Sequence, residues 1–339
     1  MPDRLDILLS GSVAAAHSGP CLLVHGGAWD IPDAYVPEHE DGLRGAIARG
    51  RAVLEAGGCA VDAVTETVVF MERHGAFDAG CGAVLTRKGT VELDAGVMDG
   101  ETLAYGAVAA VHRIPTPILA ARALLLDGAG VVRLMVGEAA ERFAALEGIA
   151  PCDPHTLVHA RERLRFVHLQ ALDEFHTSEA FLPGGRGAPP NEPVEPLQRA
   201  PRGTVGCVAR DREGRLAAAT STGGTPFRPP GRVGDSPLPG CGYYADRSGA
   251  VSTTGWGEAI TAANLAGRVV AGLERGLEPE AAARLELERM ATRIRNNSGE
   301  PATGGLITLC ADGTGAWAYT TPRMARAGWN TGSQPWTLI

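Results

Sequence analysis

Two threonines mark the ends of a stretch that reads as a β-hairpin, GTVGCVARDREGRLAAATSTGG at 203–224. The charged segment Arg212-Glu213-Gly214 in its middle predicts a three-residue turn. Counting outward along both strands from that turn puts Thr204 directly opposite Thr222. Facing side chains of an antiparallel pair have Cβ atoms about 4.5–5.5 Å apart. We therefore expect two hydroxyl groups to meet at one end of the hairpin.

A hydroxyl group is a weak nucleophile unless a neighbouring base takes its proton. Cleavage between Gly203 and Thr204 would give Thr204 a free α-amine, whose pKa of about 7.7–8.0 suits that task. The structural alternative is an ordinary threonine pair, because threonine is favoured in strands and such pairs commonly stabilise sheets. A turn one residue longer or shorter would turn one hydroxyl to the other face.

Strands are expected on both sides of this stretch, together with helices that could cover a sheet. Apolar runs and turn residues predict strands at 21–29, 106–114, 204–210, 216–221, 250–254, 305–310 and 316–320, and a hairpin at 83–93 about Lys88-Gly89. Helical spacing of apolar residues predicts helices at 41–56, 60–74, 116–126, 138–147, 155–175, 258–275 and 279–295. This order suits antiparallel sheets with helices outside them.

A segment rich in proline and glycine interrupts this order. Residues 177–203 hold six prolines and four glycines in 27 positions, a composition typical of an extended linker. The segment could separate two domains, 1–203 and 204–339, or form a loop inside one domain. Strands on both sides of it fit either interpretation.

Composition restricts the class of protein. The chain has 339 residues and a net charge of −8, without a lysine/arginine run, which argues against a nucleic-acid partner. No apolar run reaches the ~18 residues that a membrane span needs. The start, MPDRLDILLSGSVAAAHSG, lacks the positive charge bias of a signal peptide, so we expect a cytoplasmic protein. Seven cysteines without a CxxC pair predict buried free thiols.

Several motifs together resemble the plant-type L-asparaginase / isoaspartyl peptidase family of N-terminal nucleophile hydrolases. They are GTVG, TSTGG, PGRVGDSPLPGCGYYAD and STTGWGE, extended by HGGAW, FDAGCGAVLTRKGTVELDAGVMDG and GGLITL. The resemblance runs from about residue 20 to about residue 325. It implies an α+β fold, the four-layer αββα sandwich. It also implies self-cleavage at Gly203–Thr204 into an α part, 1–203, and a β part, 204–339, which stay together as one structural domain.

The resemblance assigns roles to individual positions. Thr204 matches the nucleophile, and Thr222 matches the threonine beside the new amino terminus. Arg232 and Asp235 match the residues that hold a substrate's α-carboxylate and α-ammonium, a suitable pairing of a guanidinium and a carboxylate with their opposite charges. Without the resemblance, an Arg–Asp pair at this spacing would be an ordinary surface salt bridge.

The oxyanion-hole pair of the family matches Thr254 and Gly255, where a strand meets a helix that starts near Gly257. Helix N-termini present unpaired N–H groups, although an ordinary helix cap is the structural alternative. The family also has a loop that holds a structural sodium or similar ion through backbone carbonyls, while no cofactor is expected for the chemistry. The loop residues here are Met71, Glu72, His74, Phe77, Ala79 and Cys81. His25, in HGGAW, is interpreted as structural.

This chain departs from the family where it has Asp78 in place of the usual asparagine near the nucleophile. An amide donates a hydrogen bond, whereas an ionised carboxylate cannot and would disfavour an oxyanion. The open consequences are a raised pKa of Asp78 itself, a different preferred substrate and slower self-cleavage. The segment TPFRPP, residues 225–230, is also unusual for the family, and it precedes Arg232.

The family hydrolyses L-asparagine and β-aspartyl dipeptides, and its active unit is a dimer of αβ pairs. The resemblance therefore implies a small-molecule substrate and a homodimer. Two other hypotheses stay open. One is a glycosylasparaginase-like amidase, which the TVG setting and the absence of a signal peptide disfavour. The other is an unprocessed, non-catalytic member of the family, which the joint presence of the matched threonines, Arg232 and Asp235 disfavours.

Overall fold

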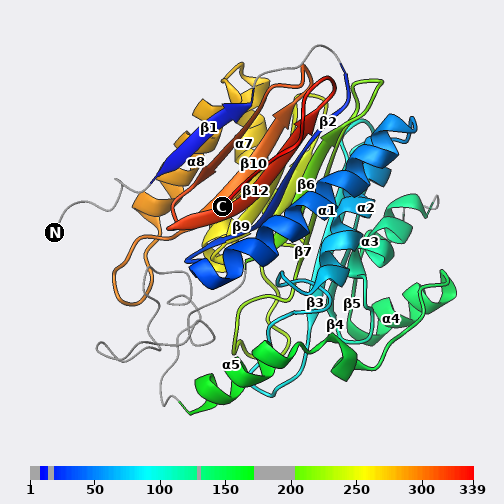
Figure 1. Cartoon of the computed structure of the whole chain (residues 1–339), viewed down its shortest axis with the longest axis vertical. Coiled ribbons are helices and arrows are strands. Elements are labelled where there is room, and N and C mark those ends of the chain that lie inside the picture. Colours follow the sequence, from blue (N-terminus) through cyan, green and yellow to red (C-terminus); the bar gives the residue numbers. More distant parts are fainter. Residues whose placement is uncertain (1–7, 14–18, 128–130, 172–202) are drawn as a thin grey trace.

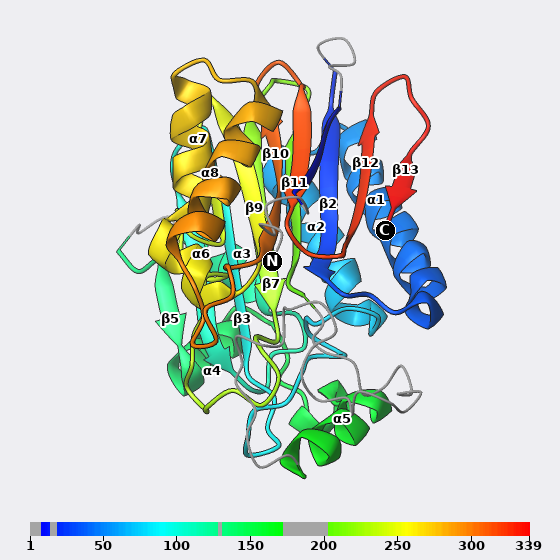
Figure 2. The ribbon, with the colours of Figure 1, turned by 90° about the vertical axis from the view of Figure 1, so that its left-hand side faces the viewer.

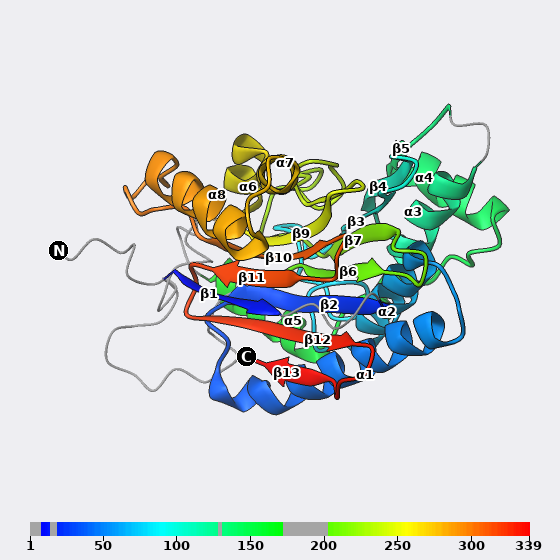
Figure 3. The same cartoon turned by 90° about the horizontal axis from the view of Figure 1, so that it is seen from above.

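Two β-sheets packed face to face form the centre of the molecule, and helices cover their outer faces (Figure 1). The structure is a computed structural model and describes residues 8–13, 19–127, 131–171 and 203–339. Figure 3 shows α7 and α8 outside one sheet and α1 and α2 outside the other. This helix–sheet–sheet–helix order is the α+β sandwich that the resemblance implies.

The larger sheet has eight strands, antiparallel except for the pair β4–β5. In spatial order they are β13 (Trp336–Leu338), β12 (Arg323–Asn330), β2 (Cys21–Trp29), β6 (Val205–Arg210), β7 (Leu216–Thr222), β3 (Leu93–Asp99), β4 (Tyr105–Val111) and β5 (Leu134–Val136). Strands from before and after residue 203 are therefore interleaved in the sheet. The strand β2 lies between two strands from the later part of the chain.

The smaller sheet has five antiparallel strands (Figure 2). Their order is β1 (Leu9–Val13), β11 (Gly315–Tyr319), β10 (Gly304–Cys310), β9 (Gly249–Gly255) and β8 (Tyr243–Ala245). Within this sheet, β1 is the one described strand that precedes residue 203. It pairs with β11 in a regular antiparallel register from Leu9↔Tyr319 to Val13↔Gly315.

Eight α-helices and two short 3₁₀ helices occur in the described ranges. They are α1 (Val36–Glu55), α2 (Ala60–His74), α3 (Pro117–Leu126), α4 (Gly137–Leu146), α5 (Ala160–Gln170), α6 (Gly257–Ala263), α7 (Leu265–Glu274), α8 (Pro279–Arg293), η2 (Asp33–Tyr35) and η3 (Pro154–Leu157). The first three α-helices lie on the larger sheet, and α7 and α8 cover the smaller one. Among the described residues, every helix is too short or too polar to cross a membrane.

The strand β7 shows how the sequence fits this sandwich. All seven of its residues, LAAATST, are buried, because the α2 side and the β9 side of the strand are both covered. A strand buried on both faces lacks the alternation of apolar and polar residues, and here small side chains let the layers approach. Three alanines of β7 are fully buried: Ala217, Ala218 and Ala219.

The hairpin predicted at 203–224 is confirmed in register. The ladder runs from Val205↔Ser221 to Arg210↔Leu216, the pairing that a three-residue turn requires. The backbone N–H of Asp211 donates to Arg215 O at 3.0 Å and closes the turn. Gly214 adopts φ +82°, a left-handed conformation that glycine permits at low cost.

Other predictions need correction. The hairpin expected at 83–93 is wrong, because residues 83–92 form a turn without a strand ladder and β3 begins only at Leu93. In that turn the Thr86 and Thr90 hydroxyl oxygens lie 2.7 Å apart, so a side-chain hydrogen bond joins the two arms of the turn. The helix expected at 258–275 is two helices, interrupted at Asn264, which has φ +50°.

The helix expected at 155–175 is also two elements, η3 and then α5, and its last residues lie outside the described ranges. Most of the linker 177–203 likewise lies outside them. The sequence did not predict the short strands β1, β5, β8 and β13, nor the eight-residue strand β12. All seven cysteines are free, but only Cys21 and Cys207 are buried and the other five are partly exposed.

Candidate active site

The Thr204 and Thr222 hydroxyl groups meet, as the hairpin register predicts. Thr204 directly precedes β6 and Thr222 ends β7. The Thr204 Oγ1 donates to Thr222 Oγ1 over 3.1 Å, and both residues are buried. The backbone N–H of Gly224 also donates to Thr222 Oγ1, at 2.9 Å. The oxygen of Thr222 therefore accepts two hydrogen bonds and holds the Thr204 hydroxyl in a defined position.

The residue before Thr204 is packed against two other segments of the site. A Cβ atom built on Gly203 would lie 2.7 Å from the Cα of Gly27 and 2.9 Å from Thr254 Oγ1. Any side chain at position 203 would therefore collide with backbone. The Thr254 hydroxyl also accepts the N–H of Ala28 at 3.3 Å. The bond between Gly203 and Thr204 thus lies next to the threonine expected in the oxyanion hole.

Thr254 and Gly255 are the last two residues of β9 and pair with β10 at Gly305 and Gly304. The helix α6 follows after Trp256. The strand-to-helix junction is where the sequence predicts it. The role of the two residues as oxyanion donors stays a prediction.

Arg232 and Asp235 lie side by side on the loop before β8. A Cβ atom on Gly257 would lie 2.7 Å from an Arg232 terminal nitrogen and 3.0 Å from Asp235 Oδ1, so both groups border the start of α6. Asp235 is buried and accepts a hydrogen bond from Thr253 Oγ1 at 3.1 Å. Burial raises the pKa of Asp235 to about 7, and the positive charge of Arg232 opposes that shift.

The strand β9 joins this pair to the nucleophile. Its residue Thr253 contacts Asp235, and the next residue, Thr254, contacts Gly203. A cationic group, an anionic group and a hydroxyl pair are thus grouped within a few residues of one strand. Such a constellation suits an amino-acid substrate whose side chain reaches the hydroxyl.

Sequence reasoning missed the partner of Arg232. The Arg232 Nε and Nη2 donate to the two carboxylate oxygens of Glu258, both at 2.8 Å. Burial alone would raise the pKa of Glu258. The hydrogen bonds from Arg232 outweigh burial and hold this pKa below its usual range. The STTGWGE motif contains this residue, and its place in the first turn of α6 was the available signal.

Asp78 lies beside the nucleophile hairpin and is fully buried. Its Oδ1 accepts the N–H of Val84 at 2.9 Å, and its backbone oxygen accepts the N–H of Gly223 at 2.9 Å. Its Oδ2 is buried and has no hydrogen-bond partner among the described residues. Burial raises the pKa of Asp78 well above its usual range, and the Val84 N–H opposes this. Its contacts are with backbone, and its part in substrate binding stays a prediction.

The residues expected to hold a cation are only partly in a loop: Met71, Glu72 and His74 lie in α2, whereas Phe77, Ala79 and Cys81 follow its C-cap Gly75, which has φ +76°. A Cβ atom on Gly82 would lie 2.7 Å from the Gly75 oxygen and 2.8 Å from the Phe77 oxygen, so carbonyls gather there as an oxygen-lined cradle would need. The carbonyl of Glu72 already accepts the N–H of Cys81 at 2.7 Å, and Arg161 Nη2 donates to Gly75 O. Two of the carbonyls in this region are therefore already engaged, one of them by a cationic guanidinium, and an ion held here stays a prediction.

A buried polar chain runs between the sheets behind Thr204. The His25 Nε2 lies 2.8 Å from Ser252 Oγ, which lies 2.7 Å from Thr220 Oγ1. Burial lowers the pKa of His25 to about 3, so the ring is neutral at physiological pH. These contacts fit the structural interpretation of His25.

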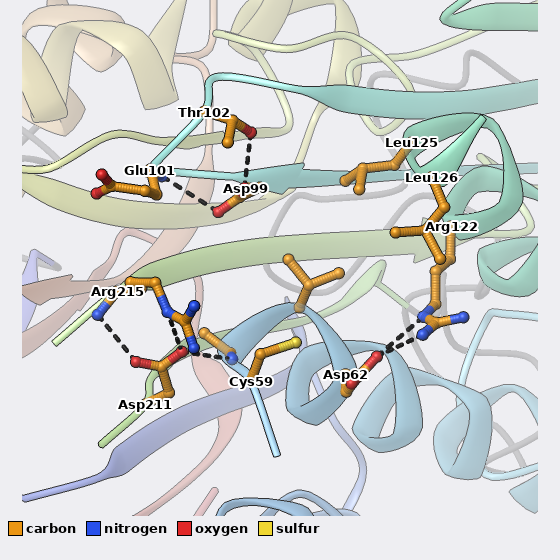
Figure 4. A pocket seen from close by; sticks show the side chains of 12 residues that line it. Cys59, Asp62, Asp99, Glu101, Thr102, Arg122, Leu125, Leu126, Asp211 and Arg215 are labelled. Carbon is orange, nitrogen blue, oxygen red and sulfur yellow. Dashed lines mark hydrogen bonds and ion pairs between the residues drawn. The ribbon is translucent and has the colours of Figure 1, made fainter. Parts of the chain in front are cut away.

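A cavity of about 300 Å³ lies at the other end of the hairpin (Figure 4). Four of its six charged residues form two ion pairs: Arg122 Nη2 lies 2.5 Å from Asp62 Oδ1, and Arg215 Nε lies 2.9 Å from Asp211 Oδ2. Asp211 and Arg215 flank the hairpin turn, whereas Thr204 and Thr222 are at the open ends of its strands. The cavity is therefore separate from the hydroxyl pair.

The family model described as "Asparaginase" matches residues 18–339. Among curated proteins, the chain is 39% identical to "Isoaspartyl peptidase/L-asparaginase" of Danio rerio, covering 91% of each chain. It is 39% identical to "Isoaspartyl peptidase" of Salmonella typhimurium, covering 94% of this chain and 97% of that protein. It is 38% identical to "Isoaspartyl peptidase/L-asparaginase" of Homo sapiens, covering 94% and 92%.

Proposed function

The chain belongs to the asparaginase family, and on that premise we propose that it is a self-processing hydrolase of L-asparagine and β-aspartyl (isoaspartyl) dipeptides. The observation that carries the proposal is the 3.1 Å hydrogen bond from Thr204 Oγ1 to Thr222 Oγ1, directly after the packed Gly203. The names of the relatives cover both substrate types. We propose Thr204 as the nucleophile of both steps below.

Maturation is an attack on the peptide bond before Thr204. The Thr204 oxygen adds to the Gly203 carbonyl carbon, the C–N bond breaks, and the nitrogen becomes the free α-amine of Thr204. Water then hydrolyses the resulting ester and leaves a carboxylate on Gly203. The contact between Gly203 and Thr254 supports this step, because it puts a hydroxyl beside the reacting peptide.

In turnover, the free amine of Thr204 takes the proton of its own hydroxyl, and the oxygen attacks the side-chain amide carbon of the substrate. Thr254 and Gly255 stabilise the oxyanion, a contribution of about 2.7–4 kcal/mol for one donor. Ammonia, or an amine from a dipeptide, leaves with a proton. Water hydrolyses the aspartyl ester and restores Thr204. Arg232 and Asp235 hold the α-carboxylate and the α-ammonium.

The proposal includes a quaternary arrangement and a location. Fragments 1–203 and 204–339 remain together as one domain, two such αβ units form a homodimer, and the protein works in the cytoplasm. The interleaving of strands from the two fragments supports the first of these statements. No cofactor takes part in the chemistry, and a sodium ion on the 71–81 loop would serve structure alone.

Replacement of the nucleophile tests the proposal. We expect Thr204→Ala to stay as one full-length band on a denaturing gel and to release no ammonia from L-asparagine. Thr65→Ala is the control, because Thr65 is also buried and its hydroxyl donates to Val61 O within α2. A Thr204→Ala protein that turns over asparagine at the wild-type rate would rule the assignment out.

The substrate is decided by assaying processed protein on L-asparagine, β-Asp-Leu and glycosyl-asparagine side by side. Hydrolysis of the first two supports the proposal. A preference for glycosyl-asparagine would identify the glycosylasparaginase-like alternative. A wild-type chain that stays uncut and inactive after long incubation would identify the non-catalytic alternative.

A further inference from the structure

We propose that Arg228 is a positioning residue for the nucleophile pair: its buried guanidinium fixes the Gly223–Gly224 turn and thereby aims the Gly224 N–H at Thr222 Oγ1. This inference rests on the proposed function, since it matters only if Thr204 and Thr222 react. Arg228 belongs to the unusual TPFRPP segment, and nothing in the proposed mechanism uses it.

The guanidinium of Arg228 has no contact with solvent and donates to backbone carbonyls. Its side chain is 0% exposed. The Arg228 Nη1 donates to Gly223 O, and Nη2 donates to Glu92 O at 2.7 Å. A charged group is costly to bury unless it is hydrogen-bonded and paired. Its position inside the protein therefore calls for a role that an apolar side chain could not fill.

The Gly223–Gly224 turn has room for the guanidinium because Gly224 lacks a side chain. A Cβ atom on Gly224 would lie 2.5 Å from Arg228 Cζ, and Gly224 has φ +85°, which side-chain-bearing residues rarely adopt. With the turn held in this way, the Gly224 N–H donates to Thr222 Oγ1 at 2.9 Å, and Thr222 Oγ1 accepts from Thr204. The contacts form one continuous series from Arg228 to the nucleophile.

Both backbone polar groups of Gly223 are hydrogen-bonded. Its carbonyl accepts from Arg228, and its N–H donates to the backbone oxygen of Asp78 at 2.9 Å. This arrangement leaves the residue after Thr222 little freedom to move. The position of Thr222 Oγ1 is then set by hydrogen bonds that do not involve Thr204.

A second series of contacts leads from Arg228 to the substrate-binding loop. Glu92, whose backbone accepts from Arg228, uses its carboxylate to accept the N–H of Gly231 at 2.9 and 3.2 Å. Gly231 directly precedes Arg232. Through Glu92, the same guanidinium connects the nucleophile turn to the loop proposed to hold the substrate carboxylate.

The charge of Arg228 is balanced by carboxyl groups around it. Burial lowers the pKa of Arg228, while Asp94, Asp78 and Glu92 oppose that shift and Arg232 adds to it. Asp94 also pairs with Thr222 in the β3–β7 register. The Glu92 carboxylate approaches Arg228 to 3.9 Å. The Asp78 carboxyl group, which replaces the usual amide of the family, thus lies close enough to Arg228 to influence its pKa.

Variants at position 228 test the role. Arg228→Met removes both hydrogen bonds, and Arg228→Lys retains the charge and one donor direction. Arg210→Met is the matched control, because Arg210 is also a buried arginine that donates to two backbone carbonyls, of Ala311 and Gly19. For each variant, one measures the cleaved fraction, the kcat and KM for L-asparagine per cleaved chain, and the melting temperature.

We expect Arg228→Met to lower kcat at least tenfold, Arg228→Lys to recover part of that loss, and KM to change much less than kcat. Arg210→Met should lower the melting temperature and leave kcat within twofold of wild type. Should Arg228→Met fail to fold, Arg228→Lys decides: a kcat at least threefold lower at an unchanged melting temperature supports the role.

The opposite results overturn it. A cleaved Arg228→Met protein with kcat within twofold of wild type removes the positioning role, as does an equal loss of kcat in Arg210→Met. If Arg228→Met does not fold, an Arg228→Lys protein with kcat within threefold of wild type also removes the positioning role. A wild type that neither cleaves itself nor hydrolyses asparagine overturns the proposed function and this inference together, whereas an active wild type isolates the failure to Arg228.

Discussion

Burial controls the charge of the carboxyl group proposed to hold a substrate ammonium. The pKa of Asp235 is raised to about 7, so the group changes charge within the physiological pH range. Only the ionised form pairs with an ammonium group. The hydrogen bond from Thr253 Oγ1 favours that form and opposes burial.

Binding of the product L-aspartate should therefore weaken in acid. With a pKa of about 7, the ionised fraction of Asp235 falls roughly tenfold between pH 8 and pH 6. We expect the inhibition constant of L-aspartate to rise by a similar factor over this range. In Asp235→Asn the constant should be high at both pH values. A wild-type constant that is the same at pH 6 and pH 8 contradicts the role.

Asp78→Asn should stabilise the protein at neutral and alkaline pH. The pKa of Asp78 is raised in the folded state, so its stability contribution is present below its usual pKa and is lost as pH rises through the folded value. Asparagine retains the acceptor for Val84 and removes the buried charge. We expect a gain of about 1–3 kcal/mol in the free energy of unfolding at pH 8 and a smaller gain at pH 5.

Urea denaturation at the two pH values measures this gain. Asp41→Asn is the control, because its side chain is 71% exposed and should change little. An Asp78→Asn protein no more stable than wild type at pH 8 would mean that the Asp78 carboxylate is stabilised by its surroundings.

At the scale of single residues, the sequence predicts contacts that follow from spacing along the chain. It does not predict contacts that arise because a side chain is buried by other segments. Thr204 and Thr222 follow from counting along a hairpin whose turn contains Gly214. Arg228 and Glu258 do not, because a sequence does not say which arginine will be enclosed or which carboxylate will face it. The sequence likewise does not predict that Asp78 Oδ2 is buried without a hydrogen-bond partner among the described residues.

Among the elements, α6 is short, but it supplies Glu258 to Arg232. Its seven residues begin at Gly257, where the absence of a side chain leaves room for Arg232 and Asp235. The two hydrogen bonds to Glu258 occupy Nε and Nη2 of Arg232. The helix therefore orients the guanidinium from one edge.

Glu258→Gln should weaken substrate binding without slowing the chemistry. The pair is partly exposed, and such pairs contribute about 0.2–1 kcal/mol, so we expect KM for L-asparagine to rise by a factor of about 1.4 to 5 with kcat unchanged. Glu101→Gln is the control, since Glu101 forms a similar exposed pair with Arg247. A fall in kcat at constant KM would show that Glu258 acts elsewhere.

Elements with strong periodicity are predictable, and those determined by local side chains are not. The helices α1 and α2 follow from apolar spacing and the Gly57-Gly58 break. The turn about Lys88 is closed by the Thr86 N–H, which donates to Thr90 O, and by the two threonine hydroxyls, but no strand ladder continues from it. The helix after 258 breaks where Asn264 adopts a left-handed conformation. In β12, Arg326 is buried with its guanidinium 3.9 Å from the Trp317 ring centre, so its strand does not look apolar.

For the whole molecule, the first described strand closes one edge of the smaller sheet. Gly11 of β1 lies against Trp317 of β11, and a Cβ atom there would lie 2.5 Å from the indole ring. A side chain at position 11 cannot fit unless the tryptophan moves. The sequence reading considered this part of the chain only as a candidate signal segment, and so did not predict the strand.

Gly11→Val should reduce the free energy of unfolding by about 1–3 kcal/mol, as expected for overpacking. The control is Ser12→Val, which introduces the same side chain at the adjacent exposed position. Thermal melts of both variants measure the difference. Equal melting temperatures would mean that β1 contributes little to the sheet.

The domain question left open by the linker depends on topology, which the sequence does not state. Apolar runs before and after residue 203 are visible, but which runs become neighbours is not. In the structure β2 lies between β12 and β6, and β7 pairs with β3. Long-range pairing of this kind depends on how whole layers pack.

The interleaving of strands from the two fragments determines how the cleaved protein holds together. If the backbone is cleaved before β6, the two fragments stay associated through several strand pairs. Separating them would break the hydrogen bonds of β2 to both of its neighbours, β12 and β6. Covalent continuity is then dispensable, and each piece alone would leave unpaired edges prone to aggregation. Two genes encoding the pieces would have to be expressed together to yield a soluble product.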